Sequence, residues 1–136
     1  MNSTEKLLLD ERGATALEFA ILAPVFFLLI FGIIAFGVLF WTQVGLQHGA
    51  EMAARCASLP TTSQSWRCPS IETYAAQNAF GLSLPATTFC SRTSSSNSCS
   101  SMPPCSGNYV GASYTFVFTG LNLGPLTLKA QACSPA

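Results

Sequence analysis

The chain has 136 residues, of which 49% are hydrophobic and only 9% are charged, and its six basic and six acidic side chains cancel. Soluble domains carry about 25% charged residues, so this composition argues against a free cytosolic globule. The sequence has no cluster of Lys and Arg, which excludes the electrostatic footprint of a nucleic-acid-binding protein. A single histidine, His48, leaves little for acid–base or metal chemistry. The composition therefore predicts a membrane-associated or secreted structural protein.

The segment 19–41 contains no charged or amide side chain. As a helix it would span about 34 Å, which is enough to cross a hydrocarbon core of about 30 Å. A secretory signal peptide is the rival interpretation, but its apolar region is shorter and ends at a small-residue cleavage site. A lipoprotein signal is disfavoured because Arg55 directly precedes Cys56. We expect a retained transmembrane helix with Pro24 as a candidate kink.

Polar and small residues flank this apolar run. Six of the twelve charged side chains lie in the first eighteen residues, which predicts a short polar tail on one side of the membrane. After Trp41 a stripe of small side chains continues at helical spacing and predicts one rod from about Thr15 to Ser58. The stripe consists of Val44, Ala50, Ala53, Ala54 and Ala57.

Several residues of the rod allow two interpretations. Gly45 and Gly49 are four apart, so they either permit close helix contact or are simply tolerated. His48 is interpreted as an ordinary residue of the polar face. A set of phenylalanines is expected to face lipid or to pack in a bundle, rather than to bind a ligand: Phe26, Phe27, Phe31, Phe36 and Phe40.

The remainder of the chain predicts a small α+β head. Ser70 is a candidate cap for a helix over 71–80 that ends at Gly81. A short strand is expected over 86–90, and the Ser-rich segment 91–107 is expected to be an exposed loop. Alternating apolar residues predict strands at 113–119 and 126–132, joined by a hairpin loop. Two strands alone are marginal, so a third strand or the short helix must cover their apolar face.

All six cysteines follow the apolar run: Cys56, Cys68, Cys90, Cys99, Cys105 and Cys133. Disulfides persist in oxidising compartments and stabilise small domains, so the head is expected to face the periplasm or the exterior. Six cysteines permit 15 pairings. Cys56 with Cys68 is the favoured pair, because it would tie the rod to the head. We expect no metal and no cofactor, since the chain has no CxxC pair and its histidine lies on the rod.

The most specific motif lies where the apolar run begins. Gly13 is followed at the fifth position by Glu18, which directly precedes Phe19. A carboxylate at this depth costs free energy unless a cation or a water-filled site meets it. Glu18 either lies in the headgroup zone and merely ends the anchor, or has a functional partner.

The segment 11–58 resembles the TadE-like proteins, minor pseudopilins of the tight-adherence (Flp-type) pilus within the type IV pilin-like group. The resemblance rests on Arg-Gly, then Glu-Phe-Ala after four residues, a proline six residues after the glutamate, and Phe-Gly pairs along the helix. The remaining part is similar only in outline. The predicted fold class is therefore a long transmembrane helix that extends into a disulfide-stapled α+β head with a two- or three-stranded antiparallel sheet.

The resemblance implies a role for particular residues. A prepilin peptidase would cut between Gly13 and Ala14 and remove the leader 1–13 on the cytoplasmic side. Glu18, beside Phe19, would then meet the freed amine of a neighbouring pilin-like subunit. Residues 14–58 would anchor the protein in the bacterial inner membrane, and the head 59–136 would lie in the periplasm.

Three function classes are weighed. The favoured one is a non-enzymatic pilus-biogenesis subunit whose helix associates with other pilus proteins. The alternative is a single-pass membrane-anchored binding or adhesion module, which would keep residues 1–13. An enzyme with a small-molecule substrate is disfavoured, because the head has no histidine and no Gly-x-Ser-x-Gly motif, and Glu72 is its only acidic residue.

Overall fold

The computed structural model describes residues 11–60, 68, 70–93, 97–100, 105–118 and 124–135, with side chains from Thr15 onward. The chain divides into two compact units, one that ends at Gly37 and one that runs from Val38 to Ala136. Residues 1–10 of the predicted leader 1–13 lie outside the described residues.

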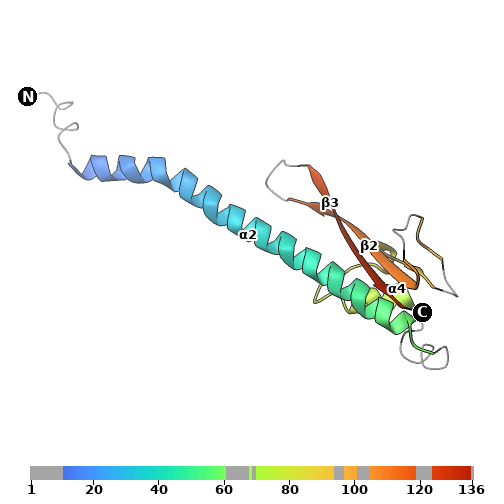
Figure 1. The fold of residues 1–136 in the computed structure, drawn as a ribbon. Coiled ribbons are helices and arrows are strands. Elements are labelled where there is room, and N and C mark those ends of the chain that lie inside the picture. The colour runs from blue at the N-terminus through green and yellow to red at the C-terminus, as the bar shows by residue number, and fades with distance from the viewer. Residues whose placement is uncertain are drawn as a thin grey trace, which may run out of the picture. The chain divides into compact units, whose positions relative to one another are not determined.

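Helix α2 (Glu11–Ala57) is a continuous helix of 47 residues (Figure 1). It begins before the predicted start at Thr15, because a charged segment rich in good helix formers can extend a helix that an apolar run has already nucleated. Pro24 lies inside the helix. Backbone N–H groups of Ser58 and Leu59 bond to carbonyls three residues earlier, so the helix ends in a tightened turn one residue before the predicted end.

A second helix, α4 (Ile71–Gln77), begins at the predicted cap, where the Ser70 hydroxyl accepts a bond from the Thr73 N–H. The helix stops three residues earlier than predicted. Asn78 forms the cap, and its side-chain amide donates to the Tyr74 carbonyl oxygen at 2.8 Å. The prediction ran too far because apolar spacing continues to Phe80 although the backbone has already turned.

The three strands form one antiparallel sheet in the order β1-β2-β3. They are β1 (Phe89–Arg92), β2 (Asn108–Val117) and β3 (Pro125–Ser134), and the short 3-10 helix η1 (Ala86–Thr88) precedes β1. The strand predicted at 86–90 is therefore shifted, since its first residues form η1. The Ser-rich loop is also shorter than predicted, because β1 extends to Arg92, which pairs with Asn97 across an isolated bridge.

Both later strands are longer than alternation predicted. β2 begins five residues before the predicted Ser113, and β3 runs two residues beyond the predicted Ala132. Every residue of 108–112 is buried, so this part of β2 carries no alternating pattern. The connector residues 119–123 lie outside the described residues.

The core forms where the end of α2, α4 and one face of the sheet meet (Figure 1). The sheet therefore has both of the supports that the sequence required, a third strand and a packed helix. The predicted small-residue stripe is confirmed as helical, and its four alanines are buried whereas Val44 is 63% exposed. The buried residues of this hydrophobic core are Leu46, Ala50, Ala53, Ala54, Ala57, Ile71, Ala75, Ala79, Phe89, Val110, Ala112, Leu128 and Ala130.

Candidate membrane and assembly surface

The apolar surface of α2 is the dominant functional feature of the first unit. Among the residues that the structure describes, one helix is long and apolar enough to cross a membrane, by length and composition, with a mean hydropathy of 2.8 in its most apolar window. None of that window is buried inside the protein. The predicted phenylalanine set is exposed along the helix. Such a surface needs lipid or other apolar helices around it.

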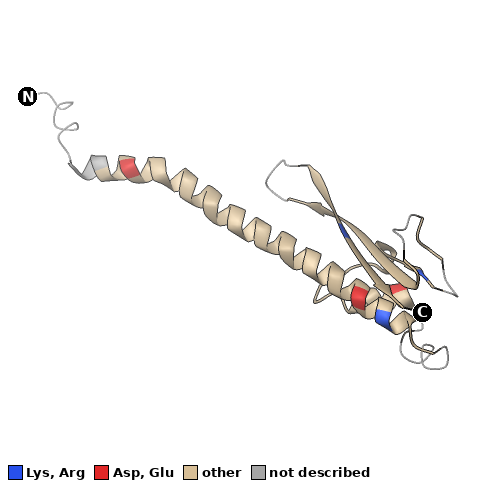
Figure 2. Ribbon diagram, in the orientation of Figure 1, with Lys and Arg blue, Asp and Glu red and all other residues tan. Residues whose placement is uncertain are grey.

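Glu18 is the single charged side chain in this surface. It lies on α2 and is exposed, and no other Asp, Glu, Lys or Arg occurs until Glu51 (Figure 2). Phe19 follows it and is 71% exposed. Gly13 and Ala14 precede it on the same helix by five and four residues. The backbone therefore places Ala14 one turn before Glu18.

The head approaches the end of α2 most closely at two glycines. A Cβ on Gly49 would lie 2.6 Å from the Ala75 carbonyl oxygen, and one on Gly45 would lie 2.9 Å from the Ala79 carbonyl oxygen. Both positions are therefore restricted to glycine. The close contact is made within the chain, by α4 and the turn after it, and this resolves the two interpretations of these glycines.

Two glutamines of α2 cover the outer edge of β3. The side-chain amide of Gln43 donates to the Lys129 carbonyl oxygen at 2.8 Å, and that of Gln47 donates to the Gln131 carbonyl oxygen at 3.1 Å. Four helical residues advance about 6 Å and two strand residues advance about 6.7 Å, so the two repeats match. The edge of the sheet is thus covered by the helix.

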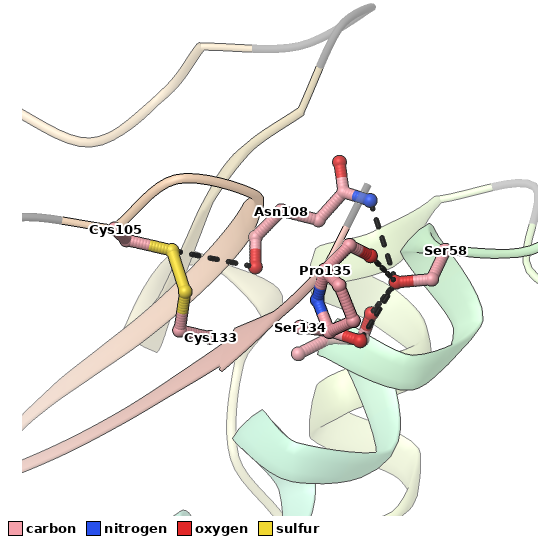
Figure 3. Close-up of a disulfide and its surroundings, with 7 residues drawn as sticks. Ser58, Cys105, Asn108, Cys133, Ser134 and Pro135 are labelled. Carbon is pink, nitrogen blue, oxygen red and sulfur yellow. Dashed lines mark hydrogen bonds between the residues drawn. A yellow bond between two sulfur atoms is a disulfide. The ribbon is translucent and has the colours of Figure 1, made fainter.

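The last turn of α2 is joined to the sheet by a polar latch (Figure 3). The Ser58 hydroxyl lies 2.8 Å from Ser134 Oγ and 2.9 Å from the Pro135 carbonyl oxygen. The buried Asn108 amide donates to the Ala57 carbonyl oxygen at 3.1 Å. Cys105 Sγ lies 3.9 Å from the Asn108 carbonyl oxygen, and as a disulfide sulfur it has no proton to donate.

Three disulfides staple the head, and no cysteine is free. Cys56 pairs with Cys68, as the sequence favoured, and ties the end of α2 to the segment before α4. The other pairs, Cys90–Cys99 and Cys105–Cys133, could not be chosen from the sequence. The first closes the Ser-rich turn on β1, and the second joins the segment before β2 to β3.

Sequence reasoning missed the role of Glu72. The buried Ser91 hydroxyl donates to Glu72 Oε1 at 2.6 Å, and Ser98 Oγ lies 3.0 Å from the same oxygen. Burial alone would raise the pKa of Glu72, but these hydrogen bonds, with that of its own backbone N–H, outweigh it and lower the pKa below its usual range. Glu72 therefore joins α4 to β1 as a carboxylate. The sequence offered one signal for this role, which is the position of Glu72 in the first turn of the helix that Ser70 caps.

His48 was expected to be an ordinary residue of the polar face, and this is wrong. Its Nδ1 lies 2.9 Å from the Asn78 carbonyl oxygen, and since a carbonyl only accepts, Nδ1 carries a proton. Its ring also lies 4.8 Å from that of Phe80. His48 therefore fixes the turn after α4. No group of three metal-binding side chains occurs among the described residues.

This geometry defines a class of protein, in which an apolar helix able to anchor the chain in a membrane continues into a small α+β head with disulfides. A family model described as TadE-like protein matches residues 13–55. The predicted resemblance is confirmed over this segment, and the match points to a pilus-associated component. No curated protein and no solved structure matches the chain significantly.

Proposed function

We propose that the protein is a non-enzymatic, pilin-like minor subunit that enters the inner membrane, is trimmed by a prepilin peptidase and associates through α2 with other pilus proteins. The observation that carries this proposal is the TadE-like match, which extends over residues 13–55 and thus over the apolar helix. The exposed apolar surface of the helix supports it, because lateral association would cover that surface.

The proposed cut lies between Gly13 and Ala14. Glycine at this place suits a protease that must approach the backbone closely, because it has no side chain to obstruct the active site.

Trimming supplies Glu18 with a cation. The new amine of Ala14 is positively charged, and Glu18 is the one acidic side chain in the first part of the apolar surface. Opposite charges attract strongly where the dielectric is low, whereas each alone is penalised there. We expect the amine of one subunit to meet Glu18 of its neighbour. Such a pair selects the register of two helices rather than adding net stability.

The cysteines give the proposed orientation. Three disulfides lie in the part of the chain after the apolar run 19–41. Disulfides persist in the periplasm and are rare in the cytosol. The head is therefore proposed to face the periplasm and the segment before Gly13 to face the cytoplasm, where the peptidase would act.

Intact mass of the protein extracted from membranes tests the proposal. The wild type is expected to lack residues 1–13, and Gly13→Trp is expected to keep them because the indole obstructs the cut. Ala20→Leu, an apolar change within the span, is the matched control and is expected to be trimmed. A wild-type chain that still begins at Met1 would exclude the pilin-like role and favour a membrane-anchored binding module.

A further inference from the structure

Few large apolar side chains are exposed among the described residues of the second unit. Some lie on α2 and the others lie on the elements beside it. Along the helix they are Val38, Phe40, Trp41 and Val44. Off the helix they are Phe80, which follows α4, and the pair Val117 and Leu126 at the ends of β2 and β3. We call Trp41, Val44, Phe80, Val117 and Leu126 the apolar rim.

Phe80 lies beside Trp41, at the position along α2 where the apolar run ends. Its ring lies 6.3 Å from the indole of Trp41, edge to face, and the side chain is 55% exposed. Trp41 is the last residue of the apolar run, where α2 turns polar at Thr42 and Gln43. Tryptophan at such a boundary typically lies among lipid headgroups. Phe80 is therefore held at the height of that boundary.

The backbone at Phe80 is strained. Its φ is 47°, a left-handed conformation that a bulky side chain rarely adopts, and Gly81 continues the turn at φ 74°. A glycine or asparagine at position 80 would avoid this cost. Strained residues persist where the surroundings hold them and their side chain has a use. Here the strain directs an aromatic ring outward, against His48 and Trp41.

The ends of β2 and β3 extend in the direction of Trp41 along α2. Gln43 bonds to Lys129 and Gln47 bonds to Gln131, so residue numbers rise together along the helix and β3. The strand residues before Lys129 therefore extend past Gln43 toward Trp41. Leu126 lies in that direction. It pairs with Phe116 of β2, and Val117 is the next residue after Phe116.

Charge is sparse at this end of the head, where the exposed Lys129, three residues from Leu126, is the one charged side chain of β2 and β3. No Asp, Glu, Lys or Arg occurs in 73–91 or in 93–128, the segments that carry Phe80, Val117 and Leu126. The far end of α2 instead carries Glu51, Arg55 and the polar latch at Ser58. An uncharged apolar surface that continues a membrane-spanning helix suits lipid and not water.

We propose that the apolar rim docks the head onto the lipid interface of the membrane that α2 crosses, with Phe80, Val117 and Leu126 inserted among the headgroups. The occupant is a phospholipid surface, because the ring of Phe80 lies 6.3 Å from that of Trp41, the residue at which the apolar run of α2 ends. The proposal rests on α2 spanning the membrane.

Tryptophan quenching by brominated lipid tests the docking on the full-length protein in phosphatidylcholine vesicles. The natural Trp41 and Trp66 are first changed to Phe, and single tryptophans are then placed by F80W, V117W, F31W and R55W. F31W reports insertion of α2 and is expected to be quenched most by bromines near the chain ends. R55W, on the exposed last turn of α2, is the matched control outside the membrane.

F80W and V117W are expected to be quenched more strongly than R55W, and most by bromines near the glycerol backbone. Docking is overturned if F31W is quenched but F80W and V117W are quenched no more than R55W. Blue-shifted but unquenched emission of F80W also overturns it, because the rim would then lie against protein. An unquenched F31W would show instead that α2 does not span the membrane, so the anchoring and the docking both fail.

Discussion

Gly49 faces the carbonyl oxygen of Ala75 with no room for a side chain between them, since a Cβ on the glycine would lie 2.6 Å from that oxygen. This contact sets the distance between α2 and α4. Backbone cannot give way as a flexible side chain can, so any larger residue must separate the two helices. The packing of the head on α2 therefore depends on the absence of one methyl group.

Gly49→Ala is expected to lower the free energy of unfolding of the head by about 1 to 3 kcal/mol, the usual cost of overpacking. Gly37→Ala is the matched control, because nothing lies within 4 Å of its Cβ position and alanine favours the helix. Thermal unfolding in detergent, followed by far-UV circular dichroism, measures both. Equal midpoints for the two variants would mean that α4 does not pack as closely as described.

The disulfides are expected to differ in their contribution according to the length of chain that each closes. The pair Cys105–Cys133 is separated by 28 residues and Cys90–Cys99 by 9. Replacing the first pair by serines should cost about 3 to 4 kcal/mol, and replacing the second about 1 kcal/mol less, by the loop-closure entropy of the unfolded chain. Urea unfolding of the two double variants measures this order. A larger loss for Cys90–Cys99 would contradict it.

Glu72 is expected to make the stability of the head depend on pH in the acidic range. Because its folded pKa is lowered, its contribution is complete above the unfolded pKa and is lost as the pH falls through the folded one. Glu72→Gln should flatten that part of the curve of unfolding midpoint against pH. Glu51→Gln, at a site on the surface of α2, is the control and should leave the curve unchanged. A wild-type midpoint that rises on acidification would be inconsistent with this sign.

Removing the Ser91 hydroxyl tests the same network from the other side. Ser91 is fully buried and donates to the Glu72 carboxylate at 2.6 Å. Ser91→Ala is expected to cost about 2 kcal/mol at neutral pH, since a hydrogen bond to a charged group is lost. Chemical unfolding at neutral and acidic pH measures the loss, which should shrink as Glu72 becomes protonated. A loss that does not change with pH would show that the hydroxyl acts without the carboxylate.

The latch at the end of α2 is expected to hold the last helical turn. The Asn108 side chain is buried and satisfies the Ala57 carbonyl oxygen, so Asn108→Ala should cost about 1 to 3 kcal/mol. Asn97→Ala, at an exposed position, is the control. Amide hydrogen exchange should show faster exchange in the last turn of α2 for the first variant alone. Unchanged protection there would mean that the disulfides hold the turn without the amide.

The sequence predicted those elements in which apolar residues recur with one period, either helical or alternating. The apolar run and small-residue stripe predicted α2, and alternation found the half-buried part of β2 from Ser113 onward. The buried part at 108–112 was missed because residues on both faces are covered. Tyr109 lies over Gly111 on the face opposite the core, so no polar side alternates with an apolar one. Local pattern cannot report burial that distant segments create.

The motif of Gly13 and Glu18 could be found from local sequence, whereas the contacts within the head could not. Glu18 stands out in the sequence because a carboxylate interrupts apolar surroundings, which is a local signal. The partners of Glu72 and Asn108 lie on other elements, and their pairing depends on how the sheet meets the helices. Two of the three disulfides were likewise beyond prediction, because the order of cysteines along the chain does not state which strands are neighbours.

The parallel course of α2 and β3 has a mechanical consequence. Gln43 bonds to Lys129 at one end of this contact, and Ser58 bonds to Ser134 at the other end. Residue numbers therefore rise in the same direction along the helix and the strand. Tension that draws the rod one way and the head the other would load these bonds together, in shear, instead of peeling them apart one at a time. The Cys56–Cys68 and Cys105–Cys133 bridges lie near the far end of this seam, where the first ties α2 to the segment before α4 and the second ties β3 to the segment before β2. Neither bridge crosses the seam, so its resistance to shear comes from the hydrogen bonds and the packed core.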